Sequence, residues 1–247
     1  MATVTWSKEI AETYDATSQA MFEPALIGPT IDLLTEFAGN GSALEFAIGT
    51  GRVGLALAAR GTAVDGIDLS PHMVEQLQRK PGANAIAVTI GDMATTRLGK
   101  TFELVYLVFN TIMNVTTQDE QVAVFESAAA HLEPGGHFLV EVVVPQLRQL
   151  PKGGLAHVFE MTPDRLGFVT FDDVEGQISW SNSWINIDGR LTAYREMYRY
   201  VWPAELDLMA RISGLRLKHR WGDWTKEPFT NESESQIAVY EKPILTR

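Results

Sequence analysis

Residues 42–59 read SALEFAIGTGRVGLALAA and indicate a strand, a glycine-rich turn and a helix in direct succession. The strand carries one acidic residue, Glu45. Glycine has no Cβ atom and adopts unusual φ/ψ angles, so the backbone around Gly49 and Gly51 can approach a ligand closely. A second acidic residue, Asp68, closes the next apolar run, where a carboxylate can accept hydrogen bonds from a ribose diol. We therefore expect a binding site for a cofactor that contains a nucleoside.

Two classes of cofactor are compatible with this motif. Residues 49–54 match GxGxxG, the fingerprint of dinucleotide binding, but Gly54 could serve only the close packing of helix on strand. The alternative is S-adenosylmethionine (SAM), with the pattern acid-x-Gly-x-Gly-x-Gly, matched here from Glu45 with Ala47 at the first glycine position. A pyrophosphate prefers a helix N-terminus without a nearby carboxylate, whereas SAM carries an ammonium and a sulfonium. Glu45 therefore favours SAM, and an NAD(P)-dependent oxidoreductase stays as the alternative.

Length and composition narrow the class of protein. The chain has 247 residues, a formal net charge of −11 and no cysteine. Its length suits one α/β domain with an insertion. The acidic charge argues against a nucleic-acid partner, because phosphate binding needs basic surface, and it favours a small molecule. The lack of cysteine excludes disulfides and thiolate ligands, and we expect no metal site.

No feature of the sequence indicates export or membrane insertion. The first residues lack the basic and apolar regions of a secretory signal. The longest apolar runs, LVYLVF and FLVEVVV, are far shorter than the roughly 20 residues that span a bilayer. We therefore expect a cytoplasmic protein without a membrane partner.

Apolar segments alternate with helical segments from residue 42 to residue 144, which is typical of a parallel sheet covered by helices. We predict strands over about 43–48, 63–68, 85–90, 103–109 and 137–144. We predict helices over about 52–60, after Ser70-Pro71, and from Thr116 or Thr117 to about 132, the last ended by the turn residues 133–136.

A β-hairpin is predicted around Asp188-Gly189, because this dipeptide lies between two segments rich in Trp, Tyr, Ile and Ser. The implied register pairs Trp184 with Ala193 and Trp180 with Met197. The opposite face would carry three tyrosines: Tyr194, Tyr198 and Tyr200. Since both faces carry bulky groups, we expect the core or a second subunit to cover one face, and the other to form a wall of the ligand pocket.

Shorter elements complete the prediction. Further strands are expected within about 156–170, and the chain closes with strands near 215–220 and 236–241. Between them a helix over 203–214 is expected to direct four residues inward: Leu206, Met209, Ala210 and Ile212.

The chain resembles the class I SAM-dependent methyltransferases over almost its whole length. Four landmarks fall in order: EFAIGTG after the first strand, GIDLS after the second, GDM after the third, and HLEPGGHFLVEV into the fifth. Ala47 is a mild departure, because alanine still permits close approach. A leading segment with Tyr14-Asp15 and an antiparallel insert after the fifth strand resemble enzymes that methylate sugar amines and other natural products.

The resemblance implies a Rossmann-like, doubly wound seven-stranded sheet whose last strand is antiparallel, with an antiparallel β insert after strand five. It implies four segments: an N-terminal helical lid over 1–40, a SAM-binding core over 41–150, the insert or cap over 151–202, and a C-terminal helix and strands over 203–247 that complete the core sheet.

The resemblance also implies a cofactor site. Its members would be Tyr14, Glu45, Ala47, Gly49, Thr50, Gly51, Asp68, Leu69, Met73, Asp92, Met93, Phe109 and Asn110. Gly49 and Gly51 would cradle the methionine and ribose part of SAM, with Glu45 near its ammonium and Asp68 on the ribose hydroxyls.

The remaining members would surround the adenine and the methyl group. Leu69 and Met73 would pack on the adenine, and Asp92, with Met93 beside it, would accept from the adenine amino group. At the end of strand four, Phe109 and Asn110 would border the methyl group. Tyr14 would close over the cofactor.

The function implied is methyl transfer to the nitrogen or oxygen of a small molecule. The sequence names no convincing general base, and Asn110 and His157 are the candidates for a catalytic residue. Trp180 and Trp184 are read as core rather than as a substrate wall. A SAM-binding protein without catalytic activity is a further alternative, and a homodimer is compatible with the bulky faces of the hairpin.

Three of the five histidines have a structural interpretation. His72 and His131, on predicted helices, are expected to be solvated. His137, at a strand start, is expected to be structural.

Overall fold

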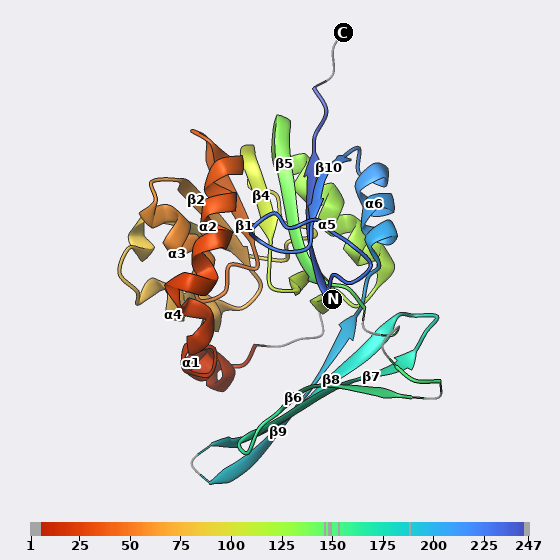
Figure 1. Cartoon of the computed structure of the whole chain (residues 1–247). Coiled ribbons are helices and arrows are strands. Elements are labelled where there is room, and N and C mark those ends of the chain that lie inside the picture. The colour runs from red at the N-terminus through yellow and green to blue at the C-terminus, as the bar shows by residue number, and fades with distance from the viewer. Residues whose placement is uncertain (1–5, 146, 148–149, 153, 188, 245–247) are drawn as a thin grey trace.

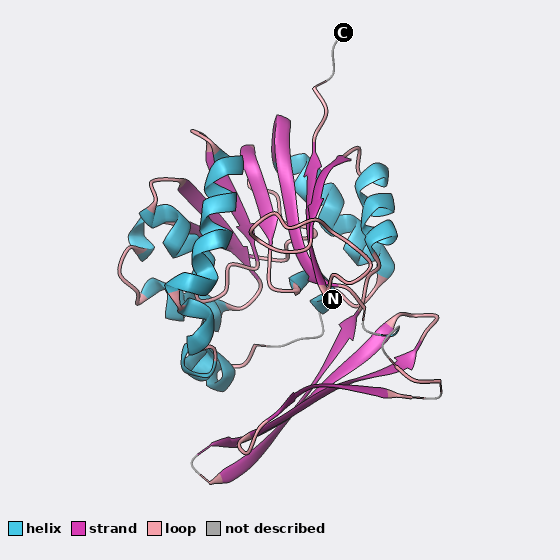
Figure 2. Ribbon diagram, viewed as in Figure 1, coloured by secondary structure: helices cyan, strands magenta, loops and turns pink. Residues whose placement is uncertain are grey.

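A seven-stranded sheet forms the centre of the protein, and helices cover both of its faces (Figure 1, Figure 2). This computed structural model describes residues 6–244, except 146, 148–149, 153 and 188. The strands of the sheet are β1 (Ser42–Phe46), β2 (Ala63–Asp68), β3 (Ala87–Ile90), β4 (Phe102–Leu107), β5 (Leu132–Val143), β10 (Arg216–Trp221) and β11 (Ser235–Glu241).

The order of the strands confirms the predicted Rossmann-like fold. They lie in the order β10-β11-β5-β4-β1-β2-β3. The pairs among β1 to β5 are parallel, whereas β11 is antiparallel to both β5 and β10. The carboxyl ends of the parallel strands therefore meet at one edge, where open α/β sheets bind their ligands.

Two apolar clusters fix the helices to the sheet. The helices are α1 (Lys8–Thr17), α2 (Pro24–Ala38), α3 (Arg52–Ala59), α4 (Pro71–Gln78), α5 (Gln118–His131) and α6 (Pro203–Ile212). One cluster joins α5 and α6 to the sheet, with the ring of Phe125 5.1 Å from that of Phe138. The other joins α2, α3 and α4 to the opposite face through residues such as Leu34 and Leu57. Helix α2 thus belongs to the core layer, although it lies in the segment expected to form the lid.

Local capping signals explain where two of the helices begin. The hydroxyl of Ser70 accepts a hydrogen bond from the Met73 N–H, and Pro71 occupies the first helical position of α4. Thr117 caps α5 in the same way, with the Glu120 N–H as donor. Both caps are those predicted from the sequence.

Three expectations about individual segments were wrong. Strand β5 begins at Leu132, immediately after α5, and the predicted turn 133–136 is an irregularity within it, because Phe102 pairs with Leu132 but Leu104 with His137. Ile212 is 57% exposed, since it lies on the outer side of the last turn of α6.

The third error concerns His131, which is buried rather than solvated. Its Nδ1 is bonded to the Ser127 carbonyl and its Nε2 accepts from the Leu98 N–H. Burial lowers the pKa of His131, which agrees with this neutral, structural role.

The insert forms a separate four-stranded antiparallel sheet beneath the core in Figure 1. Its strands, in spatial order, are β6 (Ala156–Met161), β7 (Arg165–Asp173), β8 (Ile178–Ile187) and β9 (Arg190–Arg199). The register pairs Trp184 with Ala193 and Trp180 with Met197, as predicted. Asp188 of the predicted turn lies outside the described residues.

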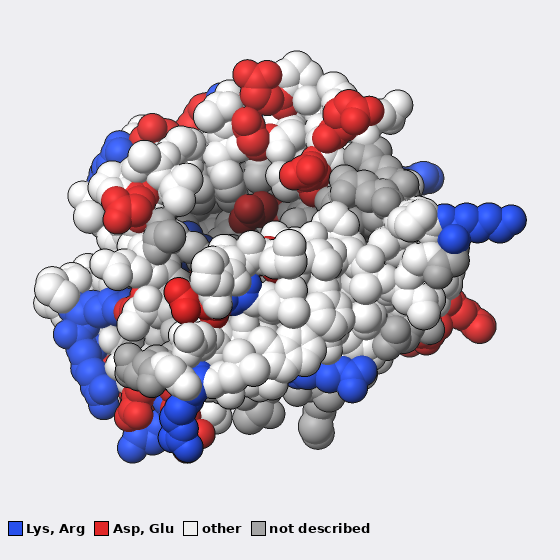
Figure 3. Space-filling view, turned by 60° about the horizontal axis from the view of Figure 1, so that its bottom comes forward, with Lys and Arg blue, Asp and Glu red and all other residues white. Residues whose placement is uncertain are grey.

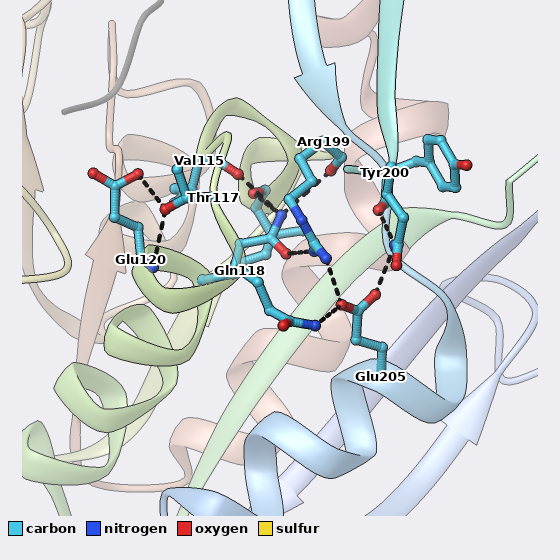
Figure 4. Close-up of polar contacts among 10 residues, drawn as sticks. Val115, Thr117, Gln118, Glu120, Arg199, Tyr200 and Glu205 are labelled. Carbon is cyan, nitrogen blue, oxygen red and sulfur yellow. Dashed lines mark hydrogen bonds and ion pairs between the residues drawn. The ribbon is translucent and has the colours of Figure 1, made fainter. Parts of the chain in front are cut away.

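A buried arginine joins the insert to the core (Figure 4). Arg199, the last residue of β9, is 4% exposed. Its guanidinium donates to Glu205 Oε1 of α6 at 2.7 Å and to Gln121 Oε1 of α5 at 2.5 Å. The Gln121 amide nitrogen in turn lies within hydrogen-bond distance of the Ile112, Val115 and Arg199 carbonyls. This cluster of Arg199, Gln121 and Glu205, the junction cluster, holds the insert against the core.

Arg199→Met is expected to lower the free energy of unfolding by about 3 kcal/mol, because it leaves Glu205 charged without its cation in a partly buried position. Urea titration followed by circular dichroism measures the loss. Arg190→Met, at the exposed start of the same strand, is the matched control and should cost little. Equal stability of the two variants would show that the junction cluster does not anchor the insert.

Candidate functional site

The turn between β1 and α3 has the backbone conformation that its glycines suggested. Gly49 has φ of 58° and Gly51 has φ of 81°, both in the left-handed region. Ala47 also lies there, with φ of 54°. A residue with a Cβ atom adopts this conformation at some cost, and such strain is concentrated at ligand sites. The turn therefore exposes its backbone toward the edge of the sheet.

Asp68 binds this turn to the loop after β2. Its Oδ2 accepts from the Gly49 N–H at 2.6 Å, and its Oδ1 accepts from the Ser70 N–H at 2.7 Å. Burial raises the pKa of Asp68, while the two N–H donors oppose that rise. A carboxylate has about four lone-pair sites, so Asp68 keeps acceptor capacity for hydroxyl groups of a ligand.

Glu45 is a buried acid beneath the same turn. It is 3% exposed and its Oε2 accepts from the Tyr106 hydroxyl at 3.0 Å. Burial raises its pKa to about 8, against the opposing effects of Tyr106 and Arg52. A Cβ atom on Gly54 would lie 2.7 Å from Glu45 Oε2, so the third glycine of the motif makes room for this carboxylate.

A cavity of about 930 Å³ opens between the carboxyl edge of the core sheet and the insert. In Figure 3 the surface is hollowed near its centre, and acidic side chains lie within and around the hollow. Nine of the sequence-predicted residues line this cavity: Tyr14, Glu45, Ala47, Gly49, Thr50, Asp68, Met73, Phe109 and Asn110. A smaller cavity of about 80 Å³ also touches Ala47 and Asp68 and is lined by three of the other four predicted cofactor residues, Leu69, Asp92 and Met93.

Gly51 lines neither of these cavities. A Cβ atom there would lie 2.8 Å from Leu77 Cγ and 3.1 Å from Leu55 Cδ1, so a side chain would strike α4 rather than enter the ligand space. The role of Gly51 in the turn is therefore conformational, because its left-handed φ starts helix α3.

Helix α1 lies against the glycine-rich turn, and its Tyr14 lines the cavity. The Thr50 hydroxyl donates to Asp15 Oδ1 at 2.6 Å, and Lys80 forms an ion pair with the same carboxylate. Tyr14 packs edge-to-face against Trp6, with ring centroids 5.5 Å apart. These contacts hold α1 against the glycine-rich turn.

The residues after β4 are fixed by the end of β5. Asn110, with φ of 58°, accepts a hydrogen bond from the Val143 N–H through Oδ1 at 2.7 Å. The Phe109 N–H donates to Glu141, and the Arg52 guanidinium lies 5.2 Å from the Phe109 ring centroid. Asn110 thus has a structural bond as well as a place in the cavity.

The insert supplies the far wall of the cavity, and the sequence analysis did not identify most of the residues in this wall. His157 of β6, the other predicted catalytic candidate, does line the cavity. Glu196, Tyr198 and Ser179 also line the cavity and had no assigned role. Trp180 and Trp184 lie on the other face, where Arg195 covers Trp180 and Phe168 stacks on Trp184. Alternation along a strand indicated two faces, but it did not indicate which one meets the ligand.

Comparisons with known proteins agree with the fold. A family model described as a methyltransferase domain matches residues 43–136. The cypemycin N-terminal methyltransferase of a Streptomyces species is 30% identical over 201 residues, which cover 81% of this chain and 82% of that protein. The CcbJ methyltransferase from Streptomyces caelestis superposes with a TM-score of 0.79 and 29% identity, over 87% of this chain and 89% of that one.

A more distant structure shares the fold alone. CalS10 from Micromonospora echinaspora, an amino pentose methyltransferase with SAM bound, has a TM-score of 0.69 and 19% identity, over 93% of this chain and 96% of that one.

Fold and cofactor motif together define a Rossmann-like methyltransferase. The chain belongs to the class I SAM-dependent methyltransferase family. Its cofactor is therefore SAM, and the dinucleotide alternative is set aside.

Glu45→Gln is expected to flatten the pH dependence of stability in the ligand-free protein. The pKa of Glu45 is about 8 when folded against an ordinary value of 4.5, so its contribution to stability is complete below about pH 4.5 and is lost as the pH rises through about 8. Between pH 5 and pH 9, the free energy of unfolding of the variant should rise relative to that of the wild type by on the order of 4 kcal/mol. Urea titrations across this range measure it, with Glu126→Gln on the exposed side of α5 as the control. Parallel pH curves for wild type and Glu45→Gln would contradict it.

Proposed function

We propose that the protein transfers the methyl group of SAM to an amine nitrogen of a small molecule held between the core sheet and the insert. The observation that carries this proposal is the single cavity that the cofactor turn and the insert share. Gly49 and Asp68 line it on one side, and Glu196 and Ser181 line it on the other. A ligand at the turn and a second ligand against the insert would thus be in contact.

The charges around the turn suit the amino-acid end of SAM. Glu45 and Arg52 both line the cavity, and the charge of Arg52 lowers the pKa of Glu45, against the larger effect of burial. We assign Glu45 to the ammonium of SAM and Arg52 to its carboxylate, because these charges are complementary. A bound ammonium would favour the ionised form of Glu45, which burial alone disfavours.

The smaller cavity suits the adenine. Asp92 and Met93 line it, and the exposed side chain of Leu69 lies at its edge. Asp92 Oδ1 already accepts from the Ala94 N–H, which leaves its other oxygen for the adenine amino group. With Asp68 on the ribose hydroxyls and Tyr14 over the entrance, every part of SAM has a partner of suitable chemistry.

When bound, SAM supplies a methyl group on a sulfonium, which is already a good leaving group. The protein's task is then mainly alignment and exclusion of water, and orientation alone can contribute several kcal/mol. The walls formed by Phe109, Asn110 and the insert restrict the acceptor to one approach. An amine requires only the loss of a proton before it attacks, which suits a cavity whose acceptor side carries carboxylate groups.

The relatives support an amine acceptor by their names. One is an N-terminal methyltransferase for cypemycin, and another is an amino pentose methyltransferase. We extend to this chain the acceptor nitrogen that the first of these names states.

A panel of amines and matched alcohols tests the proposal. Incubation with SAM, followed by mass spectrometry of S-adenosylhomocysteine, should show turnover with amino sugars or short peptides and none with their hydroxyl counterparts. Asp68→Ala should weaken SAM binding by about ten- to a hundredfold, because a charged acceptor of ribose hydroxyls is lost. Asp65→Ala on the same strand, where Asp65 pairs with Lys100, is the control. Turnover of alcohols alone, or NAD binding without SAM binding, would overturn the proposal.

We also propose that two copies of the chain associate through the outer face of the insert. That face carries Leu166, Phe168, Trp180, Trp184 and Leu191, of which Leu191 is 70% exposed. A sheet face this apolar is usually covered, and a twofold dimer covers it with the same face of the other copy.

Light scattering on the purified protein should give twice the chain mass of 27.3 kDa. Leu166→Glu should give the monomer, since it places a charge in that contact. A monomeric wild type at micromolar concentration would contradict the proposal.

The cytoplasmic location and the absence of a nucleic-acid partner stay predictions. Among the described residues, no helix has the length and apolar character to cross a membrane.

A further inference from the structure

The inner face of the insert carries a row of polar side chains that line the cavity shared with the glycine-rich turn. On β8 this face presents Ser179, Ser181 and Ser183, all lining the cavity. Directly opposite on β9 lie Tyr198, Glu196 and Tyr194 respectively. The short serine side chains leave a hollow beside the longer groups of β9. A ligand in this hollow would meet hydroxyl groups on one side and the Glu196 carboxylate on the other.

Glu196 is held in a defined position by its neighbour. The Tyr198 hydroxyl donates to Glu196 Oε2 at 2.7 Å, and the carboxylate of Glu196 has no other hydrogen bond or ion pair among the described residues. Burial and then Glu196 itself raise the pKa of Tyr198, so the phenol stays protonated and remains a donor. The second carboxylate oxygen is thereby left for a ligand in the cavity.

Tyr14 shows that Glu196 lies near the cofactor region. The pKa of Tyr14 is raised by burial first, with Arg52 opposing and the carboxylates of Asp15, Glu196 and Asp68 adding to the rise. One phenol therefore lies within electrostatic reach of both Asp68, at the cofactor turn, and Glu196, on the insert. The same three residues line one cavity.

Ser179 supplies an independent sign of a ligand. It is 1% exposed, it lines the cavity, and its Oγ has no hydrogen-bond partner among the described residues. A buried hydroxyl without a partner costs free energy, which a ligand that hydrogen-bonds it would recover. On β8 it lies directly opposite Tyr198, and Ser181, the next residue on the same face, lies directly opposite Glu196.

We propose that Glu196 binds the protonated amine of the acceptor and accepts its proton, with Tyr198 as the residue that positions the carboxylate. This inference rests on the proposed function. The acceptor R–NH₃⁺ gives one proton to Glu196, which becomes neutral. The freed lone pair then forms the new N–C bond as the S–C bond of SAM breaks and its electron pair returns to sulfur. The products are R–NH₂⁺–CH₃ and neutral S-adenosylhomocysteine, and Glu196 later returns its proton to water.

Other polar groups of the cavity are less suited to this role. Glu45 and Asp68 are bonded at the cofactor end, to Tyr106 and to two backbone N–H groups respectively. Arg165 carries the wrong charge and pairs with Glu160. Glu234 lies on the exposed rim.

Sinefungin and S-adenosylhomocysteine together test the proposal without a known acceptor. Sinefungin carries an amine where SAM carries the transferable methyl group, whereas S-adenosylhomocysteine carries nothing there. Calorimetry should show that Glu196→Gln binds S-adenosylhomocysteine within about twofold of the wild type but sinefungin at least tenfold more weakly. Tyr198→Phe should weaken sinefungin about threefold, and Glu175→Gln, on the exposed turn between β7 and β8, should change neither.

The outcomes separate the two proposals. If Glu196→Gln keeps the wild-type ratio of the two dissociation constants, Glu196 does not face the reacting position and the inference is wrong. If the wild type binds neither compound, the proposed function fails instead. If Glu196→Gln also fails to bind S-adenosylhomocysteine, Tyr198→Phe supplies the comparison, because it removes only one hydroxyl. An unchanged ratio of the two dissociation constants in Tyr198→Phe then overturns the inference.

Discussion

The junction cluster of Arg199, Gln121 and Glu205 is the constraint on which the geometry of the acceptor cavity depends. The same Gln121 amide that approaches the Arg199 carbonyl also approaches the Ile112 and Val115 carbonyls. One buried side chain thus fixes both the end of β9 and the segment that follows the cofactor-facing residues of β4. One hydrogen-bond network therefore connects the insert to the segment after β4, and these two parts line the same cavity.

The cofactor end depends on a different physical effect, the burial of acidic groups. Glu45 and Asp68 both have raised pKa values because they are removed from water. A site built this way gains when a cation enters, since the cation restores the ionised state that burial opposes. SAM, with an ammonium and a sulfonium, is a ligand of that kind, and a pyrophosphate is not. In the sequence, an acidic residue near the turn favoured SAM over a dinucleotide. The same acidic character is present in the folded site.

Local sequence signals predicted the fold well, and they failed where orientation depends on distant packing. The hairpin register follows from turn chemistry, and Asp68 follows from its place at a strand end, so both were predictable. By contrast, the sequence near His131 does not show that the Leu98 N–H bonds the imidazole, because Leu98 meets His131 only in the folded chain. Gly51 was given a ligand contact because the motif names it, yet its neighbour is Leu77 of another helix.

Glu196 was missed for a related reason, which also suggests how acceptor specificity is built. A strand with period two presents one set of side chains to each face, and periodicity alone does not say which face meets the ligand. Here β8 and β9 turn the serines, Glu196 and Tyr198 toward the cavity, whereas Trp180 and Trp184 lie on the opposite face. Substitutions on the inner face can change the acceptor while the outer face and the junction cluster keep the insert in place. The core sheet thus supplies the glycine-rich turn and the insert supplies the opposite wall, and the two parts meet at the cavity and at the junction cluster.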